Sequence, residues 1–354
     1  MQWVFILLLV IVSTSFARGW EQITELPTWK IGGAAAAVNG KIYLIGGFDY
    51  HENLGGRACT FNVDVYDTQT NIWHTAADMP TPRIGLSTAV FANEIYVFGG
   101  YDRKGPRGAF RHKKTVEMYN TETNTWIKKR DMPTLRDRFA TAVVNGKIYV
   151  IGGSVHDKKL DHEVATGLVE VYDPLTNRWE KRADMPTERG STDAVVVDGK
   201  IYVLGGYTWL KAGHLRERFV RSIEEYNPKT DQWHQLPDMP MLKGWFATVA
   251  VDNKVYTIGG VDLENRNKRF GDVDVYNPGV NKWSKINKWR KAESMTIPKT
   301  TTAVAVVKGT IYALGGLKDG GQFSPIVEAY DTGFLAVDPK DKLLTHWGEL
   351  KKSQ

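Results

Sequence analysis

Several residue types and motifs that mark common protein classes are scarce or absent in this sequence of 354 residues. Cysteine occurs once, at Cys59, which excludes an intrachain disulfide and a metal site built from several thiolates. The chain has no Asn-x-Ser/Thr glycan acceptor and no GxSxG, HExxH, Walker, CxxC or EF-hand motif. The familiar signatures of serine hydrolases, zinc proteases, nucleotide-binding enzymes and calcium-binding proteins therefore give no indication of function.

Positive charge exceeds negative charge only slightly. Lys and Arg number 46 against 40 Asp and Glu, which gives a formal net charge of +6. This is far less basic than a histone-like protein, and we expect no nucleic-acid partner. Hydrophobic residues make up 42% and charged residues 24% of the chain, a balance that indicates a folded globular protein rather than a disordered chain or a coiled coil.

The segment 1–17 resembles a secretory signal peptide. Val4–Val12 is a run of nine apolar residues, and Ser15 and Ala17 provide the small side chains of a cleavage site after Ala17. The run is too short to span a bilayer core of about 30 Å, so we expect no stable membrane insertion. One departure from the usual pattern is that Met1-Gln2-Trp3 contains no Lys or Arg. An exported chain without disulfides or glycan acceptors looks bacterial, and we expect it to be secreted or periplasmic.

A Gly-Gly pair recurs six times at nearly constant spacing, each time after a strand-like run such as KIYLIGG or KIYVLGG. A run such as VDVYD or VEMYN follows, and in five units a Trp comes seven residues after the Tyr. Runs of β-branched and aromatic residues between turn residues predict short, half-buried strands, and Asn39-Gly40, Asn145-Gly146 and Asp198-Gly199 predict type I′ hairpins. The first glycines of the six pairs are Gly46, Gly99, Gly152, Gly205, Gly259 and Gly315.

This pattern is similar to the kelch repeat, and the similarity extends from Trp20 to about residue 332. The resemblance implies an all-β fold, a six-bladed β-propeller whose blades are four-stranded antiparallel sheets. Trp20 has the same spacing to Pro27 as the Trp that ends other units, whereas the last unit has Val337 where its Trp belongs. We therefore expect the strand at Trp20 to complete the last blade, while the C-terminal tail either competes for that edge or covers it. The predicted regions are a signal peptide at 1–17, a propeller at 18–332 and a tail at 333–354.

Each repeat has a cation sixteen residues before its Gly pair, at the start of the predicted innermost strand. In a propeller these six residues would surround the mouth of the central channel. That face also bears the connections between blades and the long loops between second and third strands. Kelch proteins favour Arg at this position, so one interpretation is a structural contact with neighbouring backbone carbonyls. The other interpretation is a ring that binds an acidic ligand. The six cations are Lys30, Arg83, Arg136, Arg189, Lys243 and Lys299.

Two of the long loops on the same face are strongly basic. Residues 101–115 contain six cations against one acid, and residues 207–222 contain four against one. These loops are either solvated surface or part of a ligand site. Arg138 and Trp245 lie close to the ring cations in sequence, and guanidinium groups beside aromatic faces suit carboxylate-bearing sugars or acidic peptides. We therefore expect a monomer that binds an acidic glycan or an acidic protein surface here.

Three known activities of kelch proteins provide alternatives to simple binding. Copper-radical oxidases of this family use a cysteine, a tyrosine and histidines, and Cys59 has Tyr50 and His51 nearby. The eight histidines are scattered, however, and we expect neither a metal nor a cofactor. Ubiquitin-ligase adaptors carry an N-terminal dimerisation module, for which repeats that begin at Trp20 leave no room.

The third activity is that of an exported kelch epimerase that mutarotates sialic acid. Opening a sugar ring at its anomeric carbon needs a proton donor and acceptor beside cations that hold the carboxylate. Asp193 is one candidate, because the other repeats have Ala or Ser at its position, and Glu188 beside Arg189 is another. The alternative for Asp193 is a salt bridge between blades. We expect an exported binding module for an acidic ligand, with a sugar-acid epimerase or mutarotase as the alternative.

Overall fold

The computed structural model describes residues 19–51, 56–103, 110–157, 162–209, 217–262, 268–285, 294–300 and 303–334. The predicted signal peptide at 1–17 lies outside these residues, as does the tail from residue 335 onward. Within the described residues, no helix is long and apolar enough to cross a membrane.

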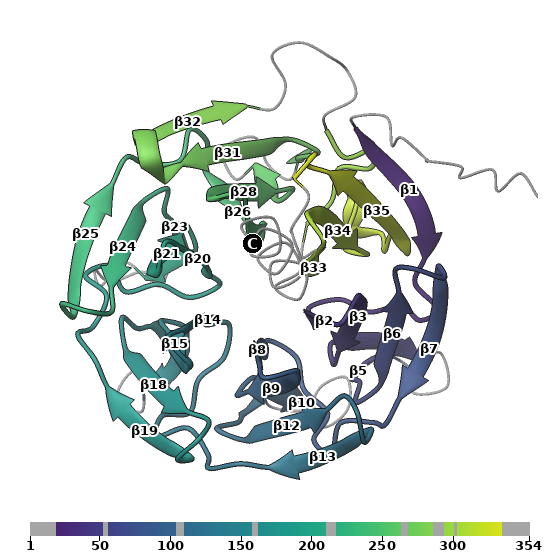
Figure 1. Ribbon diagram of the computed structural model, residues 1–354, viewed down its shortest axis with the longest axis horizontal. Helices are drawn as coiled ribbons and strands as arrows, with labels where there is room; N and C mark the ends of the chain where they lie inside the picture. The colour runs from purple at the N-terminus through teal and green to yellow at the C-terminus, as the bar shows by residue number, and fades with distance from the viewer. Residues whose placement is uncertain are drawn as a thin grey trace, which may run out of the picture.

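The described residues form six antiparallel sheets of four strands, which surround a central axis as the blades of a propeller (Figure 1). The predicted all-β propeller fold is therefore confirmed. Blade I contains β2 (Ala34–Val38), β3 (Lys41–Ile45), β6 (Val63–Asp67) and β7 (Ile72–Ala76). Blade II contains β8 (Ser87–Phe91), β9 (Glu94–Phe98), β12 (Val116–Asn120) and β13 (Thr125–Lys128). Blade III contains β14 (Ala140–Val144), β15 (Lys147–Ile151), β18 (Val169–Asp173) and β19 (Arg178–Lys181).

The other three blades repeat this order from the axis outward. Blade IV contains β20 (Asp193–Val197), β21 (Lys200–Leu204), β24 (Ile223–Asn227) and β25 (Gln232–Leu236). Blade V contains β27 (Ala247–Val251), β28 (Lys254–Ile258), β31 (Val273–Asn277) and β32 (Lys282–Lys285). Blade VI contains β33 (Ala303–Val307), β34 (Thr310–Leu314), β35 (Ile326–Asp331) and β1 (Trp20–Glu25).

The N-terminal strand β1 is the outermost strand of the last blade, as the sequence predicted. It pairs antiparallel with β35, and Trp20 lies opposite Tyr330. Their rings stack with centroids 5.5 Å apart, which reproduces within blade VI the Tyr–Trp pair that the other blades form between their third and fourth strands. Trp20 is 5% exposed, so this pairing buries most of a large apolar side chain and leaves β35 with a partner on both edges.

Aromatic residues connect each blade to the one before it. In blade III, Tyr172 and Trp179 lie opposite each other on β18 and β19 with ring centroids 5.1 Å apart. The indole Nε1 of Trp179 donates a hydrogen bond of 3.1 Å to the carbonyl of Arg130 in blade II. Three other blades form the same bond from their own Trp to a carbonyl of the preceding blade. In blade I, Trp73 donates instead to the hydroxyl of Thr24 at 3.3 Å. The repeated Tyr and Trp are therefore packing residues, as expected.

Glycine is required where one blade meets the next. Gly99 has φ of +49°, and a Cβ there would lie 2.6 Å from the carbonyl oxygen of Arg136 in the next blade. Gly100 donates its backbone N–H to that same carbonyl at 3.0 Å. A side chain at Gly99 would therefore separate the two blades.

The loops between second and third strands contain short hairpins that the sequence did not predict. In blades I to IV each loop forms a two-stranded ribbon, and in blade V it adds to a three-stranded sheet. Two 3-10 turns, η2 (Pro278–Val280) and η3 (Asp319–Gly321), complete the described elements. The extra strands are β4 (Phe48–His51), β5 (Gly56–Cys59), β10 (Tyr101–Arg103), β11 (Phe110–His112), β16 (Ser154–Asp157), β17 (His162–Ala165), β22 (Tyr207–Trp209), β23 (Glu217–Phe219), β26 (Lys243–Gly244), β29 (Val261–Asp262) and β30 (Lys268–Arg269).

Candidate functional site

The six ring cations are buried inside the blades and do not line the channel. Their residues are between 0% and 3% exposed. Arg83 shows the arrangement: its guanidinium donates to the carbonyls of Gly99 and Thr115 at 2.9 Å and to the carboxylate of Glu117 at 2.7 Å. These bonds connect the start of the innermost strand to the second and third strands of the same blade. The other members of the ring are Lys30, Arg136, Arg189, Lys243 and Lys299.

Every ring cation has its own acidic partner. The acid is the second residue of the third-strand motif, as in VDVYD and VEMYN, and the six partners are Asp64, Glu117, Glu170, Glu224, Asp274 and Glu328. Burial lowers the pKa of Lys299, and Glu328 opposes that shift by stabilising the charged ammonium. Because each pair is neutral overall, the ring adds no net positive charge to the channel mouth. The prediction that these six residues bind an acidic ligand is therefore wrong, and their role is the structural contact with backbone carbonyls.

The structure describes only some of the cationic side chains of the two basic loops. In the first loop, Asp102 pairs with both Arg111 and Lys113 at 2.7 and 3.1 Å, which neutralises part of the excess. Lys114, Arg218 and Arg221 are exposed. The side chains of the other five loop cations lie outside the described residues: Arg103, Lys104, Arg107, Lys211 and Arg216. The expected excess of charge on this face thus stays a prediction.

A pocket of about 360 Å³ lies on the propeller axis. Its described lining comes from all six blades and is formed by residues at or just before the start of the innermost strands. Arg138, Asp193 and Trp245 line it, so three of the candidate residues come together here. The other lining side chains are mostly small or hydroxylated, including Ser87, Thr88, Thr141, Ser191, Thr192 and Thr248.

The pocket carries backbone strain at three positions. In blades I to V, the residue two positions after the ring cation has a left-handed conformation: blades I and II use Gly32 and Gly85, with φ of +68° and +63°. Blades III, IV and V have Arg138, Ser191 and Trp245 there, with φ of +50°, +47° and +50°. A side chain in this conformation costs about 1 kcal/mol or more, so glycine is the residue that stability alone favours. The guanidinium, hydroxyl and indole are therefore held in the pocket against a conformational cost.

Arg138 is fixed by a network of polar groups. Its guanidinium lies 3.0 Å from Glu163 and 3.1 Å from the hydroxyl of Tyr207, and it stacks over the ring of Tyr101. Partial burial alone would lower the pKa of Arg138, but Asp137 and the neighbouring phenols and Glu163 outweigh it, so the pKa is raised. Arg138 is therefore charged at all relevant pH values.

His112 joins the same network through both of its ring nitrogens. Its Nδ1 lies 3.4 Å from Asp137 and its Nε2 lies 3.2 Å from Glu163. The two carboxylates raise the pKa of His112 to about 9, despite the opposing effect of burial. One ligand atom from each of His112, Asp137 and Glu163 lies within 4.8 Å of the others, which is close enough to hold a metal ion. Each ring nitrogen faces a carboxylate, however, so a protonated His112 neutralises these carboxylates in the way that a metal ion would.

Asp193 lies in the pocket wall with its carboxylate between two blades. One oxygen accepts the backbone N–H of Thr248 in blade V at 2.7 Å, and the other accepts the N–H of Ala194 at 2.9 Å. Burial raises the pKa of Asp193. Among the described residues no cation forms an ion pair with it, so the contact between blades is a hydrogen bond and not the salt bridge considered as its alternative.

The remaining candidates do not reach the pocket. Glu188 is exposed and does not contribute to the described lining. Cys59 is half-buried on β5, with its sulfur 4.0 Å from the carbonyl of Tyr101, while the side chains of Tyr50 and His51 lie outside the described residues.

The ring of blades and its axial pocket define a β-propeller of the binding-scaffold type. Residues 32–260 match the family model described as KLHDC2/KLHL20/DRC7 Kelch-repeats domain, and residues 246–296 and 298–334 match the Kelch motif. The chain therefore belongs to the kelch-repeat family, whose propellers generally serve as protein-interaction modules.

Similar proteins come from distant organisms. The chain is 31% identical over 262 residues to Kelch-like protein terF of Aspergillus terreus, with 71% of this chain and 54% of that protein covered. It is 30% identical over 250 residues to Beta-scruin of Limulus polyphemus, with 69% of this chain and 26% of that protein covered. The chain thus spans about half, or less, of the length of these relatives. The solved structure titled "Structure of YjhT" superposes with a TM-score of 0.68 at 18% identity and covers 89% of this chain and 99% of its own.

Proposed function

We propose that this propeller is an exported binding module whose axial pocket takes an acidic sugar. The observation that carries the proposal is the left-handed backbone at Arg138, Ser191 and Trp245, where three functional side chains replace the glycine that the same position has in blades I and II. Strain of this kind persists where a side chain is needed for function. The pocket volume of about 360 Å³ is in the range that small-molecule sites occupy.

The chemistry of the lining suits a sugar that bears a carboxylate. The guanidinium of Arg138 pairs with Glu163 at 3.0 Å but is 27% exposed, unlike the ring cations, so it can also donate to a carboxylate in the pocket. Trp245 is 41% exposed, so its indole is available to the apolar face of a sugar ring. The hydroxyl groups of Ser87, Thr88 and Ser191 can meet sugar hydroxyls. A sugar matches the volume of this axial pocket better than a protein surface does. We further propose that the chain is secreted or periplasmic and acts as a monomer.

Binding of sialic acid and glucuronic acid by isothermal titration calorimetry tests the proposal, with glucose as the uncharged control. Arg138→Gln should weaken binding of the acids by about tenfold or more, because a charge-assisted hydrogen bond is lost. Trp245→Ala should weaken binding of all three sugars. The matched controls are Arg218→Gln and Trp29→Ala, which change exposed residues outside the described lining of the pocket. Equal effects of test and control variants, or no binding of either acid, would exclude the pocket as the site.

A second function, sugar-acid mutarotation, is favoured by one observation. Asp193 lies in the same pocket as Arg138, and burial raises the pKa of its carboxyl group, which favours a part in proton transfer. Exchange between the anomers of sialic acid, measured by NMR, distinguishes the two functions. Faster exchange that Asp193→Asn abolishes without loss of binding supports the enzyme, and binding without faster exchange supports the binding module.

A further inference from the structure

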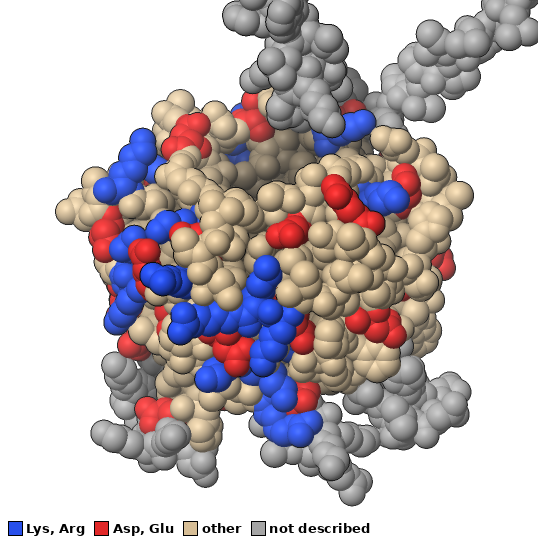
Figure 2. All heavy atoms as spheres, turned by 60° about the horizontal axis from the view of Figure 1, so that its bottom comes forward, with Lys and Arg blue, Asp and Glu red and all other residues tan. Residues whose placement is uncertain are grey.

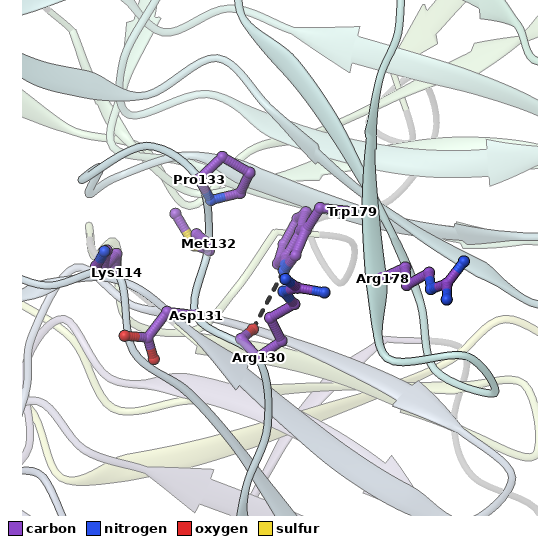
Figure 3. Close-up of a pocket in the computed structure, with 7 residues that line it drawn as sticks. All are labelled: Lys114, Arg130, Asp131, Met132, Pro133, Arg178 and Trp179. Carbon is purple, nitrogen blue, oxygen red and sulfur yellow. Dashed lines mark hydrogen bonds between the residues drawn. The ribbon is translucent and has the colours of Figure 1, made fainter.

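A second pocket lies on the outer rim of the propeller, far from the axis, where blade II meets blade III. It has a volume of about 520 Å³ and is lined by the segment Arg130–Pro133 and by Lys114, Arg178 and Trp179 (Figure 3). Trp179 projects toward the segment Arg130–Pro133, to which its indole donates the hydrogen bond described above. In this view Lys114 lies at one end of the groove and Arg130 beside Trp179, whereas the side chain of Arg178 leaves its strand on the side opposite to Trp179. We call these residues the rim groove.

The cations of the rim groove do not form ion pairs in the described part of the chain. Lys114, Arg130 and Arg178 are exposed, and no hydrogen bond or ion pair connects their side chains to another described residue. The acid of the groove, Asp131, is half-buried and has Lys128 3.7 Å away. The groove therefore carries an excess of positive charge, and Figure 2 shows Lys and Arg side chains gathered on the part of the rim that blades II and III form.

The repeat makes it possible to compare this groove with its equivalents. A backbone hydrogen bond identifies the position equivalent to Lys114, whose carbonyl accepts the N–H of Met132. Where blade I meets blade II the carbonyl of Phe61 accepts the N–H of Met79, and where blade III meets blade IV the carbonyl of Gly167 accepts the N–H of Met185. The positions of Arg130 and Arg178 are occupied by Ala77 and Thr125 where blade I meets blade II. They are occupied by Ala183 and Gln232 where blade III meets blade IV. Those junctions therefore have no cation at any of the three positions. The junction of blades IV and V has two cations at these positions, Arg221 and Lys282.

The packing of one blade against the next does not require these cations. The indole-to-carbonyl bond forms equally well in the junctions where alanine replaces Arg130. The cations of the rim groove thus add charge to a packing contact that is complete without them. This separates them from the ring cations, which are buried and paired.

Exposed apolar residues identify the type of ligand. Ile127, Leu135 and Leu175 are 47%, 49% and 83% exposed, and each lies within three residues of a groove residue along the chain. Exposed apolar side chains of this size can contact the apolar side chains of a peptide, and a sulfated glycan has none to offer them. Cations beside exposed Leu and Ile suit a peptide that has both carboxylates and apolar side chains.

We propose that the rim groove docks an acidic, leucine-containing segment of a protein partner. The guanidinium groups of Arg130 and Arg178 and the ammonium of Lys114 hold the carboxylates, and the exposed Ile127, Leu135 and Leu175 receive the leucines. This site is independent of the axial pocket, because none of its lining residues lines that pocket.

The test uses a fluorescein-labelled peptide of Asp and Glu with leucine at every third position, and binding is measured by fluorescence anisotropy at low and at physiological salt. Lys114→Gln/Arg178→Gln removes two cations from the rim groove. The matched control, Arg221→Gln/Lys282→Gln, removes two cations from the equivalent positions of the junction of blades IV and V, so the change in net charge is identical. We expect the first pair to weaken binding about tenfold and the second to leave it within about twofold. All four residues are exposed, and unchanged melting temperatures would confirm that both double variants fold.

Other results overturn the proposal. Equal weakening by the two pairs would show that only the overall charge matters, and absence of binding would exclude an acidic peptide as the ligand. Equally tight binding of a peptide that has serine in place of leucine, or tighter binding of a heparin oligosaccharide, would show that the groove takes any polyanion. A loss of peptide binding in Arg138→Gln would place the peptide in the axial pocket, whereas failure of sugar binding alone leaves the rim groove untouched.

Discussion

The pH dependence of stability provides the sharpest test of the network around His112. In the folded protein two carboxylates, Asp137 and Glu163, face the ring nitrogens, with Arg138 on the far side of Glu163 and the ring of Tyr101 nearby. The carboxylates raise the pKa of His112 from its ordinary 6.5 to about 9. A histidine whose pKa is higher in the folded state stabilises the fold while it is protonated. Its contribution is complete below pH 6.5 and is lost as the pH rises through 9.

The size of the effect follows from the two pKa values. The folded state binds the proton of His112 more tightly than the unfolded state does, and the two pKa values set the difference in free energy. Integrated from pH 6 to pH 9.5, this difference amounts to about 3 kcal/mol of stability. Glu163 does not offset this loss, because hydrogen bonding to His112 lowers its pKa and it stays ionised throughout the interval. We therefore expect the free energy of unfolding to fall by about 3 kcal/mol over this range from His112 alone.

Urea unfolding followed by tryptophan fluorescence, at a series of pH values from 6 to 9.5, measures this loss. Other groups titrate in the same range, so the informative quantity is the difference between the parent and His112→Gln. The variant should be less stable at pH 6 and should approach the parent at pH 9.5. Parallel pH profiles for the two proteins would refute the network as described, because they would mean that His112 has the same pKa in the folded and unfolded states.

Three further predictions concern packing and strain. Arg136→Met should cost about 3–5 kcal/mol because it leaves the buried carboxylate of Glu170 unpaired, and chemical unfolding of Arg136→Met/Glu170→Met should show most of that stability restored. Trp20→Ala should cost about 3–5 kcal/mol in the same assay. Trp29→Ala is the control, because Trp29 is 54% exposed. An equal loss of stability in this control would show that the burial of Trp20 does not stabilise the closure of the ring by β1. Ser191→Gly should raise the free energy of unfolding by up to about 1 kcal/mol through relief of its left-handed backbone, and a melting temperature below that of the parent would contradict the strain.

The blades and their closure could be predicted from the sequence because they depend on short, repeated patterns. The Gly pairs recur six times and the Tyr–Trp spacing five times, so one unit can be checked against the next, and the displaced Trp20 supplies the Trp that the sixth unit lacks. The partners of the ring cations were equally regular, since Asp64 and Glu117 lie at matching positions of VDVYD and VEMYN. Counting the cations without these acids produced the wrong assignment.

The site itself was less predictable, for physical reasons. The left-handed backbone at Arg138 and Trp245 leaves no trace in the identity of those residues, because glycine is the only residue that signals such a φ. Asp193 stood out because the other repeats have Ala or Ser in its place, and the structure puts it in the pocket wall. His112 gave no signal, since its two carboxylates come from a different blade and are brought to it only by the fold.

Closure by β1 also sets the order in which the molecule can be completed. Trp20 and Tyr330 lie roughly 300 residues apart in sequence yet pair directly. At synthesis rates of about 5–20 residues per second, β1 leaves the ribosome some 15–60 seconds before its partner strand exists. During that interval blade I can form its own four strands, whereas Trp20 has no place to be buried. The propeller therefore cannot become a closed ring until the last repeat has been made, and the N-terminal strand lacks its partner strand until then.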